Sequence, residues 1–246
     1  MAKDYSRDKL KKHRFMEGSS RLSAHLPKTR RFAFKHFDKL LRQYGAVVVK
    51  PIGGSRGRNV FQVSYTGNQV YQLQLDDQKT RIHGRREAYR YIKQQIGSRK
   101  YMVQRLISRA TVKGRPFDMR IIVQRKKRSS RWKVTARLAK IAGEGYIVSN
   151  LTRSHGIPLR MSKALRHSSL RHMRPLVLKK RVDRISIHAA RRLRRLFPGH
   201  RIYGLDVALD RGGYAWIIEA NLFPSMSHFR KLGNARLLRR IQRYRH

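Results

Sequence analysis

The chain mixes runs in which polar and apolar residues alternate, typical of strands, with stretches in which apolar residues recur every three or four positions, typical of helices. Strands are predicted at residues 47–50, 60–65, 70–75, 101–104, 117–124 and 132–141 and in a hairpin at 202–221. Helices are predicted at residues 27–44, 84–95, 182–196 and 227–245. Residues 1–26 are polar and predict an extension or a loosely attached helix.

The hairpin at residues 202–221 carries the most informative pattern. If Gly212-Gly213 is its two-residue loop, the ladder puts Asp206 directly opposite Glu219. Moving the turn by one residue shifts the pairing by an even step, so both carboxylates still share a face. Asn221 lies on that face too.

Two facing carboxylates repel each other unless a proton or a cation lies between them. Together with an amide oxygen they form a hard ligand set that suits Mg2+ or Mn2+. The alternative is a solvated hairpin end whose acids form ion pairs with the many arginines of the chain.

Composition narrows the functional classes. The 246 residues are 40% hydrophobic, enough for one substantial core or two small ones that share an interface. Cysteine is absent, which excludes disulfides, thiolate metal sites and cysteine nucleophiles. The N-terminus has no apolar secretory segment and no apolar run could span a bilayer, so a cytoplasmic protein is expected.

The formal charge of +47 predicts contact with a polyanion, which could be nucleic acid, acidic polypeptide or an anionic surface. The segment between Arg160 and Arg201 contains a single acid, Asp183, and is the candidate contact. The alternative for that segment is a solvated helix face.

A glycine-rich loop follows the strand that ends at Lys50. Its glycines at 53, 54 and 57 could let backbone N–H groups close over phosphate oxygens. The lysine precedes the loop, which excludes a Walker A motif, and the order is reversed from that of protein kinases. Combined with the downstream carboxylate hairpin, the loop predicts a nucleotide site.

The order of these motifs resembles the ATP-grasp superfamily, in particular its YheC/YheD-like, endospore coat-associated branch. The Asp-x-Arg, Ser-Asn-Leu and Glu-x-Asn elements also resemble the ribosomal-protein glutamate ligases. The matching pieces are Leu26-Pro-Lys-Thr-Arg30, Val49-Lys-Pro51, Gly53-Gly-Ser-Arg-Gly57, Tyr101-Met-Val-Gln104, Gly114-Arg-Pro-Phe-Asp-Met-Arg120, Val148-Ser-Asn-Leu151, Gly204-Leu-Asp206 and Ile218-Glu-Ala-Asn221.

This resemblance implies an α+β ATP-grasp fold in which two α+β subdomains clasp a nucleotide. The expected domain is residues 27–246, with the lysine strand, glycine loop and adenine edge at 27–105 and the metal-binding and acceptor half at 106–246. Only the extension at 1–26 precedes it, so the full N-terminal domain common in the superfamily is not expected.

The resemblance also implies a role for each site residue. ATP would be held by Lys50, by Gly53, Gly54, Ser55 and Gly57 of the loop, and by Gln104, Arg105 and Leu106 at the adenine edge. Asp206, Glu219 and Asn221 would bind Mg2+, with Mn2+ as the alternative metal. Charge on the transferred phosphoryl group would be stabilised by Arg120, Arg137 and Asn150.

The expected function is therefore an ATP-dependent carboxylate-amine ligase that forms an amide through an acyl phosphate. The net charge of +47 favours an acidic peptide or glutamate-rich substrate, with nucleic acid as another partner of the basic surface. The alternatives are a phosphotransferase on the same fold and a non-catalytic polyanion-binding protein. The branch resemblance adds spore association to the expected cytoplasmic location.

Overall fold

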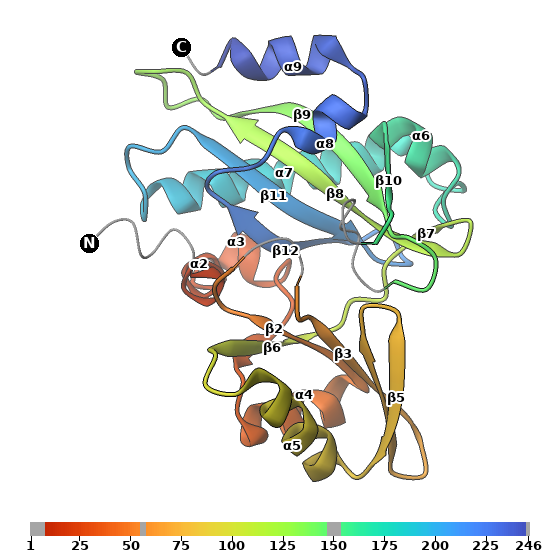
Figure 1. Ribbon diagram of the computed structural model, residues 1–246. Coiled ribbons are helices and arrows are strands. Elements are labelled where there is room, and N and C mark those ends of the chain that lie inside the picture. The colour runs from red at the N-terminus through yellow and green to blue at the C-terminus, as the bar shows by residue number, and fades with distance from the viewer. Residues whose placement is uncertain (1–7, 55–57, 147–153, 245–246) are drawn as a thin grey trace.

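Two mixed halves, each built on an antiparallel sheet, make up the protein (Figure 1). The computed structural model describes residues 8–54, 58–146 and 154–244. The first sheet has the strand order β1-β6-β2-β3-β4-β5. Its strands are β1 (Thr29–Arg31), β2 (Ala46–Pro51), β3 (Phe61–Gly67), β4 (Val70–Leu75), β5 (Gln78–His83) and β6 (Tyr101–Arg105).

The second sheet has the order β10-β9-β8-β11-β12, and the short strand β7 pairs with β8. Its strands are β7 (Thr111–Val112), β8 (Arg115–Gln124), β9 (Lys133–Ile141), β10 (Ile157–Leu159), β11 (Ile202–Leu209) and β12 (Ala215–Asn221). The mixture of helices and antiparallel sheets confirms the predicted α+β class.

Two helices, α4 (Phe34–Tyr44) and α5 (Arg85–Ile96), cover one face of the first sheet. Apolar side chains at alternate strand positions, such as Val47, Val49 and Val103, form a core with them. The intervening positions point to the other face, and Lys50, Gln104 and Gln74 are buried there. Gln74 donates across to the Gly145 carbonyl at 2.6 Å, so this polar face is the one that meets the second half.

Helices pack on both faces of the second sheet. One face packs on α7 (Pro175–Arg194), through Val182, Ile185 and Leu193 among others, and α6 (Met161–Arg166) joins the same core. The other face packs partly on α8 (Ser227–Lys231) and α9 (Ala235–Gln242). The uncovered part of that second face is where the polar side chains of the candidate site gather.

Several predicted boundaries were wrong. The helix expected at residues 27–44 begins at Phe34, because residues 29–31 pair with β6 as an edge strand. Strands β5, β7 and β10 were not predicted, and the helix expected at 227–245 is divided into α8 and α9. The helix expected from Val182 begins earlier, at Pro175, a favourable first helical residue.

The N-terminal segment is an integral part of the second core. Its described residues form α2 (Lys9–Glu17) and α3 (Ser20–Ser23), which contact α7. Met16 and Leu22 are 2% and 0% exposed and belong to the core that contains α7. The prediction of a loosely attached segment was therefore wrong, because its few apolar side chains are spaced to enter that core.

We expect Leu22→Ala to lower the free energy of unfolding by about 2–5 kcal/mol, since it leaves a cavity in a closed core. The exposed neighbour Arg21 is the matched control, and Arg21→Ala should change the value by less than about 0.5 kcal/mol. Urea titration of both variants measures the difference. Equal, small effects would show that α3 is dispensable for the core.

Candidate functional site

The hairpin of β11 and β12 has the register that the sequence predicted at its carboxylates, reached by a different turn. Asp206 pairs directly with Glu219, as expected. The strands, however, end at Leu209 and Ala215, and the register shifts between Asp206 and Val207. The longer turn and this bulge, which leaves Ile218 unpaired in the ladder, offset each other, so the two carboxylates still face one another.

Each of these carboxylates is paired with basic side chains. Asp206 accepts two hydrogen bonds from Arg120, at 2.8 and 3.1 Å, and one from Lys140 at 3.0 Å. Glu219 lies 3.4 Å from the Nζ of Lys9. Burial alone would raise the pKa of Asp206, but Arg120 and Lys140 outweigh it and hold that pKa well below its usual value.

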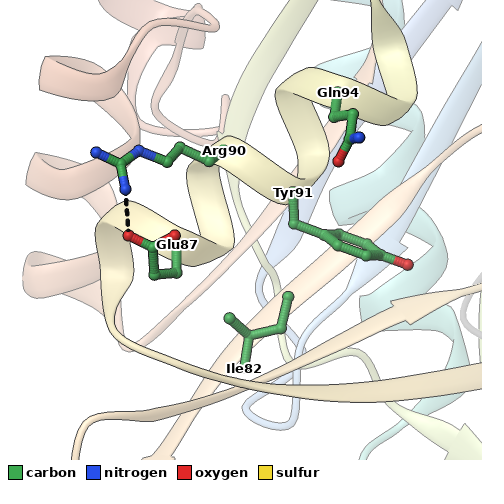
Figure 2. A pocket seen from close by; sticks show the side chains of 5 residues that line it. All are labelled: Ile82, Glu87, Arg90, Tyr91 and Gln94. Atoms are coloured by element: carbon green, nitrogen blue, oxygen red, sulfur yellow. Dashed lines mark hydrogen bonds and ion pairs between the residues drawn. The ribbon is translucent and has the colours of Figure 1, made fainter.

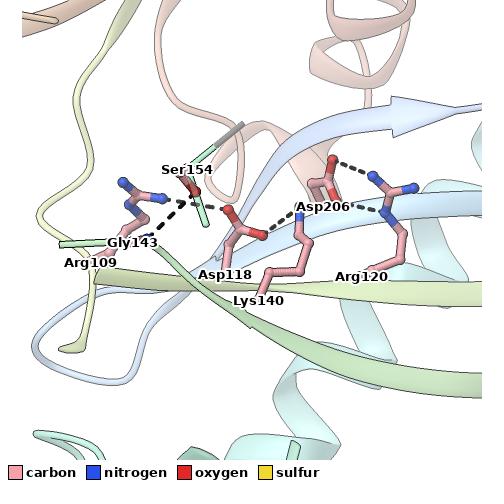
Figure 3. Close-up of polar contacts among 7 residues, drawn as sticks. All are labelled: Arg109, Asp118, Arg120, Lys140, Gly143, Ser154 and Asp206. Carbon is pink, nitrogen blue, oxygen red and sulfur yellow. Dashed lines mark hydrogen bonds and ion pairs between the residues drawn. The ribbon is translucent and has the colours of Figure 1, made fainter. Parts of the chain in front are cut away.

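A row of alternating charges extends from Asp206 along the sheet (Figure 3). Lys140 bridges Asp206 and Asp118, with Nζ 2.8 Å from the Asp118 carboxylate. Asp118 in turn lies 3.4 Å from the guanidinium of Arg109. The sequence interpretation did not include Lys140, although pairing 117–124 with 132–141 places it opposite Asp118 and on the face of Arg120.

Arg137 is not part of this site. It pairs with Ile121 in the β8 and β9 ladder, and Ile121 belongs to the core on the α7 face of the sheet. Its guanidinium forms an ion pair with Asp183 of α7. The prediction that Arg137 stabilises charge on the transferred phosphoryl group is corrected. Strand positions alternate between the two faces of the sheet, so Arg137 and Lys140 point to opposite faces, and Lys140 is the one that shares the face of Asp206.

Lys50 connects the first half with the hairpin. Its Nζ donates to the side-chain oxygen of Gln104 at 2.8 Å and to the Ile218 carbonyl at 3.4 Å. Ile218 is the residue at the bulge, beside Glu219. Burial lowers the pKa of Lys50 to about 8, and nearby Glu219 opposes that shift.

Residues of the predicted adenine edge, Gln104 to Leu106, form hydrogen bonds and ring contacts with other parts of the protein. The Gln104 side chain pairs with Lys50 and donates to the Thr29 hydroxyl at 2.8 Å. The Arg105 guanidinium lies over the rings of Tyr44 and Trp216, at 4.6 and 5.2 Å. The Arg105 and Leu106 N–H groups donate to the carbonyls of Lys28 and Ala46. Contact with adenine stays a prediction, and it would have to use other groups of this segment.

The glycine loop is described only in part. Gly53 and Gly54 are exposed directly after β2, and Gly54 has a φ of 83°, in the left-handed region that favours glycine. Ser55 and Gly57 lie outside the described residues, as does Asn150. Their predicted roles stay predictions.

The chain after β12 turns back beside Arg120, which only a glycine at 204 permits. A Cβ at Gly204 would lie 2.4 Å from the Cβ of Pro224 and 3.4 Å from the Arg120 side chain. This turn leads to α8, where burial, followed by the charges of Lys140 and Arg120, lowers the pKa of His228 to about 4. His228 is a further residue near this site that no motif indicated.

The carboxylate face fits a hard cation in part. Glu219 and Asn221 share one face of β12, and Asp206 faces Glu219, so their oxygens suit Mg2+ or Mn2+. Both Asp206 oxygens already accept hydrogen bonds from Arg120. Oδ1 also accepts from Lys140, so a cation shared by these three side chains would use the remaining acceptor position of Oδ2 or displace a basic partner of Asp206. Among the described residues no cluster of three His, Cys, Asp or Glu side chains offers another metal site.

A shallow depression of about 300 Å3 lies elsewhere, between α5 and β5 (Figure 2). Glu87 and Arg90 form an ion pair in its wall. It lies on the α5 side of the first sheet, away from Lys50 and the hairpin, and none of the predicted site residues lines it. Its lining residues are Ile82, Glu87, Arg90, Tyr91 and Gln94.

The basic segment from Arg160 to Arg201 lies mainly on the far side of the second sheet from the carboxylates. Its main element, α7, packs on the face opposite Asp206 and Arg120. Lys180, Arg184 and Arg191 are exposed on its outer surface. A molecule bound along that surface is separated by the sheet from the hairpin carboxylates.

Solved structures share the architecture of this protein. The fold is similar to that of D-alanyl-alanine synthetase A from Vibrio cholerae, with a TM-score of 0.54, 14% identity, and coverage of 97% of this chain and 65% of that chain. A D-alanine–D-alanine ligase from Bacillus anthracis, solved with ATP, gives a TM-score of 0.52, 13% identity, and coverage of 96% and 63%. Together with the family match to residues 1–245, this likeness shows the fold of the ATP-grasp class.

Within that class, the chain belongs to the YheC/D-like ATP-grasp family, whose pattern matches residues 1–245. The resemblance drawn from the motifs is thus confirmed. The chain is also 23% identical over 223 residues to the endospore coat-associated protein YheD of Bacillus subtilis. The aligned region covers 88% of this chain and 48% of that protein. The chain spans about half the length of that relative.

We expect Asp206→Asn to lower the free energy of unfolding at neutral pH by about 3 kcal/mol or more, because Arg120 and Lys140 lose a buried counter-charge. A carboxyl group with a lowered pKa stabilises the fold above its unfolded pKa of about 4, and that contribution is lost as the pH falls towards the folded value. The gap between wild type and variant should therefore narrow below about pH 4.

Urea titrations between pH 3 and pH 7 measure this gap, with exposed Asp77→Asn as the matched control. A gap that stays constant over this range would show that the ionised Asp206 carboxylate contributes nothing to stability.

We expect Arg137→Met to lower the free energy of unfolding by about 1–3 kcal/mol, because Asp183 loses its partner. The variant should keep the wild-type increase in melting temperature on addition of MgATP, whereas Arg120→Met should lose most of it. Thermal unfolding of the two variants with and without MgATP makes the comparison. If both variants lose the increase in melting temperature to the same extent, Arg137 contributes to MgATP binding.

Proposed function

We propose that this protein is an ATP-dependent ligase that joins a carboxylate to an amine through an acyl phosphate. The observation that carries the proposal is the contact of Lys50 with the Ile218 carbonyl, 3.4 Å apart, which brings the lysine strand of one half to the carboxylate hairpin of the other. The D-alanine–D-alanine ligase of similar fold was solved with ATP, which supports ATP as the nucleotide.

In the proposed reaction an oxygen of the substrate carboxylate bonds to the γ-phosphorus of ATP, and the bond to the β-phosphate oxygen breaks to release ADP. The amine then attacks the acyl carbon, phosphate leaves, and the amine proton passes to solvent. This chemistry depends mainly on orientation and on fixed positive charge, and it needs no covalent nucleophile from the protein.

The chain's own residues would divide these tasks. Lys50, which is 7% exposed, would bind phosphate oxygens from the first half. Arg120 and Lys140, held in place by Asp206, would stabilise negative charge on the transferred group from the second half. Glu219 and Asn221 would bind Mg2+ with Asp206, and the bound cation would neutralise phosphate charge.

An acidic peptide or glutamate-rich chain is the proposed substrate class, and the net charge of +47 supports it. Basic residues also surround the carboxylates themselves: Arg109, Lys140 and Arg120 form one network of ion pairs with Asp118 and Asp206, and Lys9 pairs with Glu219. Such surrounding positive charge attracts anionic substrates at low and moderate ionic strength.

No helix within the described ranges is long and apolar enough to cross a membrane.

The test is to incubate the protein with ATP, Mg2+ and a panel of acidic peptides with candidate amines, and to read mass changes and ADP release. A condensation product with stoichiometric ADP supports the ligase. A phosphorylated product would indicate the alternative phosphotransferase. If neither product forms and ADP release stays at background, the remaining alternative is a non-catalytic polyanion-binding protein.

We expect Glu219→Gln to reduce ADP release in this assay by about 100-fold or more, the scale seen when a group that stabilises transition-state charge is lost. Stability should also fall, because Glu219 is the counter-charge of Lys9 and lies near the buried ammonium groups of Lys12 and Lys50, so ADP release is compared at a temperature at which the variant is folded. The matched control is Glu87→Gln, which removes an exposed acid paired with Arg90 far from the hairpin. Full activity of Glu219→Gln would discard its role as a metal ligand.

A further inference from the structure

Helix α2 buries a polar face where an apolar one would be expected. Lys9, Lys12, His13 and Met16 recur at helical spacing and share one side of the helix. Met16 enters the core beside α7. Lys12 and His13 are only 3% and 5% exposed, although both carry groups that water solvates strongly.

This face of α2 lies between the two halves of the protein, beside the candidate site (Figure 1). The Lys9 N–H donates to the Ile52 carbonyl at 3.0 Å, next to the glycine loop of the first half. The Lys9 ammonium lies 3.4 Å from Glu219 of the second half. The start of α2 therefore contacts both the segment that leads into the predicted phosphate loop and the predicted metal-binding hairpin.

The next turn of the helix brings more basic groups to the same place. Burial lowers the pKa of Lys12 to about 8; the charges of Glu219 and Asp8 oppose that shift, and the charge of Lys9 adds to it. Burial and then the charge of Lys50 lower the pKa of His13 to about 4. Lys12 and His13 thus lie within electrostatic reach of the hairpin and of the lysine strand.

The cluster buries more positive charge than the surrounding acids balance. Lys9, Lys12 and Lys50 gather around Glu219, Asp8 is the other acid that acts on Lys12, and the acceptors of Lys50 are neutral oxygens. The Nε2 of His13 has no hydrogen-bond partner among the described residues. Buried polar groups are normally satisfied, and buried charge is costly when it is not balanced. This arrangement fits a site that an anion completes.

We propose that α2 is a third wall of the nucleotide site and that Lys12 and His13 bind the polyphosphate of the nucleotide. The inference rests on the proposed function and adds two ligands that come from outside both sheets. A polyphosphate carries several charges on a short chain, so it can meet cations from Lys50 on one side and α2 on the other. A single substrate carboxylate offers one charge at one end, so it fits this arrangement less well.

Lys12→Met tests the proposal, because methionine fills a similar volume without the charge. Removing a buried charge should leave the melting temperature of the free protein unchanged or raise it. The affinity for ATP should fall about tenfold or more, the scale of losing a charge-assisted hydrogen bond, while the affinity for adenosine changes less than about threefold. Calorimetric titration with ATP, ADP, AMP, adenosine and inorganic tripolyphosphate, at constant Mg2+, measures both.

The matched control is Arg14→Met on the same helix, whose side chain is exposed and outside the buried face. It should bind every ligand of the series as wild type does. His13→Leu should weaken ATP binding, and His13→Gln, which keeps an N–H donor, should recover part of the loss. This pair separates the hydrogen bond from the packing of the helix.

Three outcomes would overturn the inference. If wild type binds ATP and both Lys12→Met and His13→Leu bind it equally well, α2 contributes no phosphate ligand, although the proposed function stands. If ATP and adenosine lose affinity to the same extent, the helix acts through folding alone. If wild type binds neither ATP nor tripolyphosphate, the nucleotide site and the proposed function fail together.

Discussion

Asp206 is the centre on which the candidate site depends. Its carboxylate holds Arg120 by two hydrogen bonds and Lys140 by one; Lys140 is buried and the Arg120 side chain is largely covered. Two long basic side chains would otherwise move freely or avoid burial altogether. The carboxylate thus fixes two cations on the sheet face that also bears Glu219, and this preorganisation is what phosphoryl chemistry requires.

The two halves meet through polar groups. Lys50 reaches the Ile218 carbonyl, Gln74 reaches the Gly145 carbonyl, and the Lys9 N–H reaches the Ile52 carbonyl. Such contacts gain little net free energy, because water can replace them. A ligand that binds both halves can therefore compete with them, which would suit the proposed nucleotide site.

The charge of the chain is divided between two environments. At the candidate site, basic side chains are balanced in part by Asp118, Asp206 and Glu219 and are largely buried. On α7 they are exposed, and its single acid, Asp183, pairs inward with Arg137. The two groups lie on opposite faces of one sheet, so the high net charge need not serve a single partner.

The sequence by itself determined the local features. Period-two runs located most strands, and the predicted hairpin register placed Asp206, Glu219 and Asn221 on one face, which the longer turn preserves only because the bulge at Ile218 restores the pairing. The motif order indicated the family that the chain matches over residues 1–245. These features survive because each depends on alternation within one element or one ladder.

Tertiary structure decided which residues share the site. Sequence spacing could not show that Arg137 faces α7 while Lys140 faces Asp206, because that depends on which face of the sheet each helix covers. Nor could a polar N-terminal segment reveal that α2 lies beside Glu219, since its position is fixed by Met16 and Leu22 entering a core built from residues far along the chain. Long-range packing, which leaves no local periodicity, made those choices.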